Sequence, residues 1–96
     1  MNTAFAHIQI LDLKALELIG EGIGLNRAGV ILGCHCQKVR YRLDRLEKAF
    51  GGELVTRPGA GRDSRTTLTD MGKKVLSQVT PILAQWDEAL LEWGEV

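Results

Sequence analysis

The chain has 96 residues, of which 45% are hydrophobic and 25% are charged, and this composition fits one small globular domain. No apolar stretch approaches the length of a membrane span, and the first residues lack the basic region and apolar run of a secretory signal. We therefore expect a cytoplasmic protein with no membrane partner, in which Cys34 and Cys36 are reduced thiols.

Positive and negative charges balance over the whole chain but are distributed unevenly along it. Between Cys34 and Lys74 there are ten Lys and Arg residues against five Asp and Glu, whereas the rest of the chain has two against seven. A partner responds to charges within about 8–10 Å, which is the Debye length near physiological salt, rather than to the summed charge. The uneven distribution predicts a basic surface on the middle of the chain.

Three helices are expected in the first half of the chain, after a loose arm or a short turn over residues 1–9. Residues 10–19 have apolar side chains at helical spacing, Asp12 is suited to the cap or first turn, and a run of glycines follows. Asn26 is suited to cap a second, short helix that stops at Gly33. A third helix follows Cys34-His35-Cys36 and ends near Phe50, before two glycines.

The third helix has an apolar stripe on one face and polar side chains on the other. Val39, Leu43 and Leu46 form the stripe, and a wheel at about 100° per residue places Gln37 and Tyr41 opposite. Such a helix fits the major groove of duplex DNA, where residues of the first turns reach bases and later ones reach phosphates. We expect Gln37, Lys38, Arg40 and Tyr41 to contact bases and Arg42, Arg45 and Lys48 to contact phosphates. A solvated helix face is the alternative, because Asp44 and Glu47 bring negative charge to this helix.

Residues 53–57 and 65–68 have the composition of two short strands joined by a glycine-rich turn at 58–64. We expect a hairpin whose tip bears Arg57, Arg62 and Arg65 and lies on phosphates or in a minor groove. The alternative is an ordinary surface loop.

A long final helix is expected from Thr69 or Asp70 to about Trp93, with a kink or a break into two abutting helices at Pro81. Apolar side chains recur on it at spacings of three, four or seven residues, and the stripe is wide enough to cover the chain's own core and also to meet a partner. Packing within one chain only is the alternative. The predicted dimerisation residues are Val75, Val79, Ile82, Leu83, Trp86, Leu90 and Trp93.

The order of these elements predicts a mainly α fold of the winged helix-turn-helix type. It comprises three helices, a two-stranded β-hairpin wing and a long C-terminal dimerisation helix. We assign residues 1–69 to a winged helix-turn-helix DNA-binding domain and residues 70–96 to a C-terminal linker and dimerisation helix.

Residues 36–57 resemble the recognition helix and wing of LysR-type transcriptional regulators, with Arg45-Leu46-Glu47 at the equivalent place. Leu68-Thr69-Asp70-Met71-Gly72 is similar to the Leu-Thr-x-x-Gly signature that opens the linker helix of this family, and Asn26-Arg27-Ala28-Gly29 to the start of its second helix. The resemblance implies a bacterial regulator at the nucleoid that forms a homodimer through antiparallel linker helices. The full predicted set of DNA-binding residues is Asn26, Arg27, Cys36, Gln37, Lys38, Arg40, Tyr41, Arg42, Arg45, Arg57, Arg62 and Arg65.

The chain departs from this family in three respects. The stretch between Arg57 and Leu68 is longer and resembles the N-terminal domain of the molybdate-dependent regulator. His35, Cys36 and Gln37 stand where the family usually has serine, glutamine and proline, so the target sequence does not carry over. The chain also ends soon after the linker helix, so we expect no small-molecule effector domain.

Other kinds of site are disfavoured by the residue spacing. Cys34, His35 and Cys36 cannot easily surround one tetrahedral ion and only His7 remains as a further histidine, so we expect no metal and no cofactor. The glycines near residue 22 follow a helix rather than a strand, unlike a dinucleotide site, and no catalytic set is visible, so no enzyme is predicted. A redox response of a thiol near the helix start stays open.

The leading hypothesis is a homodimeric, sequence-specific regulator that binds double-stranded DNA. Two other hypotheses stay open. One is a protein-interaction module that antagonises a full-length regulator by heterodimerisation, and the other is a DNA-organising protein without sequence preference.

Overall fold

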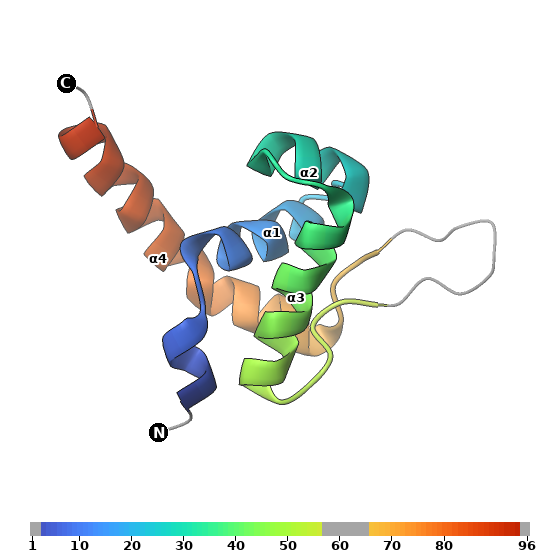
Figure 1. Cartoon of the computed structure of the whole chain (residues 1–96). Coiled ribbons are helices and arrows are strands. Elements are labelled where there is room, and N and C mark those ends of the chain that lie inside the picture. Colours follow the sequence, from blue (N-terminus) through green and yellow to red (C-terminus); the bar gives the residue numbers. More distant parts are fainter. Residues whose placement is uncertain (1–2, 57–65, 95–96) are drawn as a thin grey trace.

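The computed structural model describes residues 3–56 and 66–94, which form a short 3₁₀ helix and four α-helices (Figure 1). The first three α-helices pack together, and the fourth packs against the first of them before it extends away (Figure 1). The predicted mainly α class is therefore confirmed. The elements are η1 (Thr3–His7), α1 (Ile10–Gly20), α2 (Leu25–Leu32), α3 (Cys36–Phe50) and α4 (Asp70–Gly94).

One apolar core lies between α1, α3 and α4. Each helix turns its apolar stripe inward, as the period of 3.6 residues requires, and residues 54–55 close the core after α3. The innermost side chains are Ala15, Leu16, Ile19, Val39, Leu43, Leu46, Leu54, Val55, Val75, Val79 and Leu83, together with Ala28 of α2. The core positions predicted on the third helix are confirmed.

The ends of the helices follow local hydrogen bonding and glycine geometry. The Asp12 carboxylate in the first turn of α1 accepts a hydrogen bond from the Gln9 backbone N–H at 2.9 Å. Helix α2 begins at Leu25 after an N-cap at Gly24, so the cap predicted at Asn26 is wrong, and Asn26 lies in the first turn. Gly33 and Gly51 end α2 and α3 with φ angles of 73° and 78°, a left-handed region in which glycine carries no steric penalty.

The predicted two-stranded β-hairpin wing is wrong. Among residues 53–56 and 66–69 the only sheet-like pairing is one isolated antiparallel bridge between Val55 and Leu68, and the described residues contain no strand. The physical reason lies in the partners of the backbone. The Leu54 N–H donates to the Glu47 carboxylate at 2.9 Å and not across the pair, so on this side the pairing does not continue beyond the backbone hydrogen bond from the Thr69 N–H to the Leu54 carbonyl oxygen at 3.0 Å. An isolated pair of strands gains little stability in water, and among residues 53–56 and 66–69 the pairing remains this one bridge.

The start of α4 explains the Leu-Thr-x-x-Gly pattern in physical terms. The Thr69 hydroxyl accepts a hydrogen bond from the Gly72 N–H at 3.0 Å and donates to the Glu53 carbonyl oxygen at 2.6 Å, so it caps α4 and ties it to residue 53. Gly72 is buried against the Leu54 carbonyl, where a Cβ atom would collide with the backbone. The threonine and the glycine together let residues 53–55 lie directly on α4.

Helix α4 continues through Pro81 as one element, so the alternative of two abutting helices is not found. None of the helices in the described ranges combines the length and the apolar character that crossing a membrane would require.

Candidate nucleic-acid interface

The turn between α2 and α3 is tight and fixes where α3 begins. Gly29 of α2 is buried beneath the Cys34 carbonyl oxygen, which would lie 2.5 Å from a Cβ atom at this position. The His35 side chain caps α3, because its Nδ1 atom accepts a hydrogen bond from the Gln37 N–H at 3.1 Å. Glycine at position 29 allows this close approach, and the His35 cap stabilises the start of α3.

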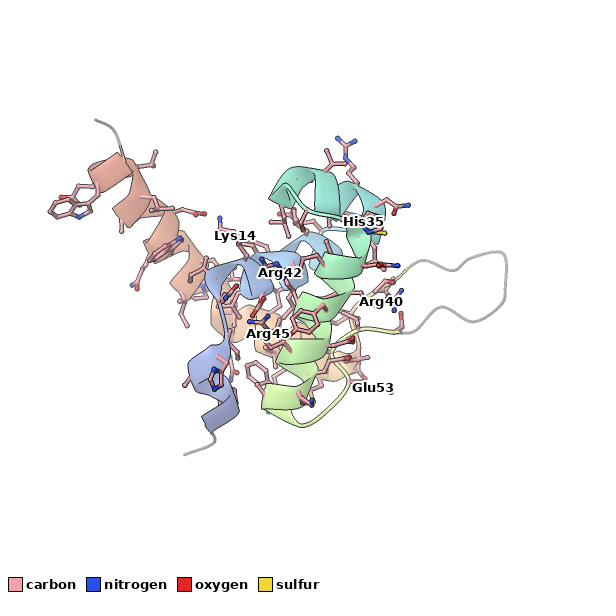
Figure 2. All side chains as sticks on the ribbon, viewed as in Figure 1. Lys14, His35, Arg40, Arg42, Arg45 and Glu53 are labelled. Atoms are coloured by element: carbon pink, nitrogen blue, oxygen red, sulfur yellow. The ribbon has the colours of Figure 1, made fainter. Side chains whose placement is uncertain are left out.

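Helix α3 has one buried face and one exposed face. Val39, Leu43 and Leu46 lie in the core, whereas the side opposite them faces away from the rest of the chain. Arg40 is half-buried, and Figure 2 shows it on the opposite side of α3 from Arg42 and Arg45. The exposed side chains are Gln37, Lys38, Tyr41, Asp44 and Lys48.

Tyr41 lies at the centre of the exposed face, between two cations. Tyr41 is 54% exposed, with the Lys38 Nζ atom 5.4 Å and the Arg45 Cζ atom 4.9 Å from its ring centroid. These positions are three and four residues from Tyr41, a spacing at which side chains on a helix are neighbours. Cation–π attraction holds an aromatic ring and two positive groups together as one exposed cluster.

Two of the arginines predicted to contact phosphates, Arg42 and Arg45, form hydrogen bonds and ion pairs within the protein. Arg42 is 7% exposed, and its NH1 atom donates to Asp12 Oδ1 at 2.9 Å and to Gln9 Oε1 at 3.0 Å. Arg45 is half-buried, with its Nε atom 3.7 Å from Asp12 Oδ2 and its NH1 atom donating to the His7 carbonyl oxygen at 3.2 Å. Arg42 is therefore turned into the protein, whereas Arg45 reaches the edge of the exposed face.

The remaining predicted DNA-binding residues lie at the start of α2, at the start of α3 or outside the described part. Asn26 and Arg27 are exposed in the first turn of α2, and Cys36 is half-buried as the first residue of α3. Arg57, Arg62 and Arg65 lie outside the described residues. The structure thus places Asn26, Arg27, Gln37, Lys38 and Tyr41 at the surface, in the first turn of α2 and in the first turns of α3.

Acidic side chains mark one border of the exposed face. Tyr41, Asp44, Lys48 and Glu53 are among the residues that line a shallow hollow beside the C-terminal half of α3. The Glu47 carboxylate in the same hollow is held by the N–H groups of residues 54 and 55. Its negative charge therefore serves the contact between α3 and the chain that follows.

The predicted dimerisation residues divide into two groups along α4. Val75, Val79 and Leu83 are 1–6% exposed and belong to the core of the chain. The remaining four are substantially exposed, namely Ile82 (53%), Trp86 (42%), Leu90 (47%) and Trp93 (78%). Lys14 of α1 forms an ion pair with Asp87 at 2.8 Å, near the point where α4 leaves the other helices (Figure 2).

The sequence does not predict the structural roles of three side chains at this face, namely Asp12, His35 and Glu47. The sequence predicts Asp12 at the helix start, but its role as a buried counter-charge for two arginines of α3 is a long-range pairing that no local pattern indicates. The capping role of His35 could have been read from its place before a helix, because a side-chain acceptor is expected there. The role of Glu47 also depends on residues beyond its own helix, because its carboxylate accepts hydrogen bonds from the N–H groups of residues 54 and 55. Within the described ranges, no cluster of three or more histidine, cysteine or acidic residues could hold a metal ion.

Comparisons with known proteins place this geometry in context. No family model matches the chain. The chain is 31% identical over 85 residues to the small neutral protease regulatory proteins of Streptomyces coelicolor and Streptomyces lividans, a match that covers 88% of this chain. The chain spans about a quarter of the length of these two relatives, 25% and 24% respectively.

A solved structure has a similar arrangement of helices. The crystal structure of a probable transcriptional regulator from Pseudomonas aeruginosa matches with a TM-score of 0.75 and 20% sequence identity, over 94% of this chain and 29% of that one. The two proteins therefore share a fold over almost the whole of the chain described above.

Proposed function

We propose that the chain acts as a transcriptional regulator of the LysR type that binds duplex DNA, with α3 as the recognition helix in the major groove. The observation that carries the proposal is the outward face of α3, where Gln37, Lys38 and Tyr41 stand clear of the interior. The fold shared with a probable transcriptional regulator and the similarity to two regulatory proteins support the same conclusion.

The two helices of the tight turn have different parts in this proposal. Gln37, Lys38, Arg40 and Tyr41 contact base edges, because they lie in the first turns of α3 and offer donors, acceptors and an aromatic surface. Asn26 and Arg27 at the start of α2 contact phosphates, together with Arg45 and Cys36 at the border of α3. Arg42 is left out of the contact set, because its guanidinium is bonded to Asp12 in the interior.

We further propose that the regulator is a homodimer formed through α4. Residues 1–69 then form the DNA-binding domain, and the helix from residue 70 onward links and pairs the two chains. The apolar stripe of α4 continues beyond Leu83, the last of its residues in the core, so Trp86, Leu90 and Trp93 remain uncovered, and Ile82 beside Leu83 is also exposed. Antiparallel pairing of this half with its copy would bury the stripe and place two recognition helices about 34 Å or more apart, as successive major grooves require.

The test starts with a duplex selected from a random DNA pool by the purified chain. Binding of that duplex and of a scrambled duplex is then compared by fluorescence anisotropy at several salt concentrations. We expect Tyr41→Ala and Arg40→Ala to reduce the discrimination between the two duplexes about tenfold. Arg27→Ala should weaken both equally and reduce the salt slope by about one.

Lys14→Gln is the matched control, because it also removes one positive charge but lies on α1 at the junction with α4. It should leave both affinities close to those of the original chain. A chain that selects no duplex, or selects one whose binding none of the three α2 and α3 variants changes, would overturn the proposal. Self-association without DNA binding would point instead to a protein-interaction module.

A further inference from the structure

A single buried carboxylate faces two arginines of the proposed recognition helix. Asp12 is completely buried near the start of α1, and its carboxylate oxygens lie 2.9 Å from the Arg42 NH1 atom and 3.7 Å from the Arg45 Nε atom. The Gln9 backbone N–H donates to the same carboxylate. Burying a charge is costly unless it is paired and hydrogen-bonded, so the carboxylate and its cations are held in one arrangement.

The two arginines are held in different ways. The Arg42 NH1 atom has two interior acceptors, and Arg42 belongs to the packing between α1 and α3. Arg45 connects the interior to the surface, since it lies 3.7 Å from Asp12, donates to the His7 carbonyl oxygen of η1 and stacks on the Tyr41 ring. A continuous path of contacts therefore runs from Asp12 through Arg45 to the centre of the exposed face.

We infer that Asp12 is a positioning residue, which restrains Arg45 and the Tyr41 ring and offsets part of the Arg45 charge. This inference rests on the proposed function. An unrestrained surface arginine pairs with any phosphate that it reaches and adds affinity without regard to sequence. An arginine held by a buried carboxylate reaches one place only, so Asp12 lowers non-specific affinity and raises discrimination between sequences.

The experiment uses a double variant that removes the carboxylate without leaving a buried charge unpaired. Asp12→Asn alone would leave Arg42 buried without its counter-charge, and it is therefore combined with Arg42→Gln. The double variant has the same net charge as the original chain, so a change in DNA affinity cannot come from the total charge. Circular dichroism and the unfolding midpoint establish that the variant is folded before DNA binding is measured.

The inference predicts two opposite changes for this double variant. Affinity for the scrambled duplex should rise about threefold, with a salt slope steeper by about one, because Arg45 is released. Discrimination between the selected and scrambled duplexes should fall about tenfold, because the Arg45–Tyr41 cluster is no longer held in place. A loss of structure would lower both affinities together, which distinguishes positioning from a purely structural role.

Arg45→Gln is the second variant, and the fold tolerates it because this side chain lies at the surface edge. Alone it should lower discrimination by a similar factor but reduce affinity for the scrambled duplex, opposite in sign to the double variant. In a chain that already contains Arg45→Gln, the Asp12 and Arg42 substitutions should change neither the discrimination nor the affinity for the scrambled duplex, since Asp12 acts through Arg45. The control Lys14→Gln with Asp87→Asn removes another ion pair between helices without change of net charge and should alter neither quantity.

Unchanged discrimination in a folded double variant, or in Arg45→Gln, would overturn the inference. The inference would also be overturned if the Asp12 and Arg42 substitutions still changed discrimination in a chain that contains Arg45→Gln. These results differ from failure of the proposed function, in which the original chain itself binds no duplex.

Discussion

The two halves of α4 have the same amphipathic pattern but different surroundings. Val75, Val79 and Leu83 are covered by the other helices of the chain, whereas Trp86 and Trp93 follow on the same stripe and remain exposed. The difference arises from length, because α4 has 25 residues and α1 only 11. An apolar stripe thus indicates that this face of the helix packs against another apolar surface. The lengths of the neighbouring helices determine whether that surface belongs to the same chain.

The largest expected effect comes from the covered half. Leu83→Ala should lower the free energy of unfolding by about 2–5 kcal/mol, because it removes a fully buried side chain and leaves a cavity. Urea denaturation measures the change. Leu90→Ala is the matched control on the same stripe and should change the stability of the dilute chain by less than about 0.5 kcal/mol. Equal losses for the two variants would contradict the division of α4 into a covered and an uncovered half.

The uncovered half gives the next largest effect, on self-association rather than on folding. Trp86→Ala should weaken the proposed dimer about tenfold to a hundredfold, because aromatic side chains at an interface carry much of its binding energy. Sedimentation velocity over a dilution series measures this change. The exposed Ser77→Ala on another face of α4 is the control. An original chain that stays monomeric at high concentration would contradict the proposal.

Trp86 and Trp93 are the only tryptophans of the chain, so its intrinsic fluorescence reports on this surface directly. Tryptophan emission should shift to longer wavelength on dilution, as the rings become exposed to water. No shift over a range in which the sedimentation coefficient changes would place the dimer contact elsewhere.

The sequence predicted the helices well because their signals are local. Glycines at positions 33 and 51, the stripe of Val39, Leu43 and Leu46, and Thr69 each act on neighbouring turns, and these elements were confirmed. The predictions were wrong where a residue distant in the sequence determines the local structure. The Glu47 carboxylate accepts the hydrogen bond of the Leu54 N–H, so among residues 53–56 and 66–69 a pattern typical of strands forms one bridge and no strand.

The same reasoning applies to the candidate site. Gln37, Lys38 and Tyr41 were predicted to be exposed from their angular position on one helix, which is a local property. Arg42 lies at the flank of the helix, and the sequence predicts a phosphate contact for it. At such a flank position, the helix that packs alongside determines whether the side chain is exposed or buried. The buried carboxylate that pairs with it comes from 30 residues away in the sequence, and a helical wheel contains no information about it.

The ion pair at the boundary between the two halves of α4 has a smaller effect. Asp87→Asn breaks the 2.8 Å contact with Lys14, whose side chain is 28% exposed while that of Asp87 is 53% exposed. Because water and salt screen such a pair, the loss of unfolding free energy should be about 0.2–1 kcal/mol and should shrink at high salt. Glu88→Gln removes a neighbouring negative charge and serves as the control. A loss as large as that of Leu83→Ala would mean that the ion pair, rather than the apolar stripe, holds α4 in place.

The smallest effect concerns Glu17 of α1. Burial, followed by the nearby Glu21 carboxylate, raises the pKa of Glu17 above its ordinary value, while Lys14 lowers it and Asp87 adds a further rise. A raised pKa means that the folded chain binds this proton more tightly than the unfolded chain, so this group's contribution to stability falls as the pH rises through the window between the two pKa values. Glu17→Gln should therefore be slightly more stable than the original chain at neutral pH, and the difference should vanish as the pH falls below the ordinary glutamate value. Thermal unfolding at neutral and at acidic pH measures both quantities. A stabilisation that persists in acid would show that the carboxylate charge is not its cause.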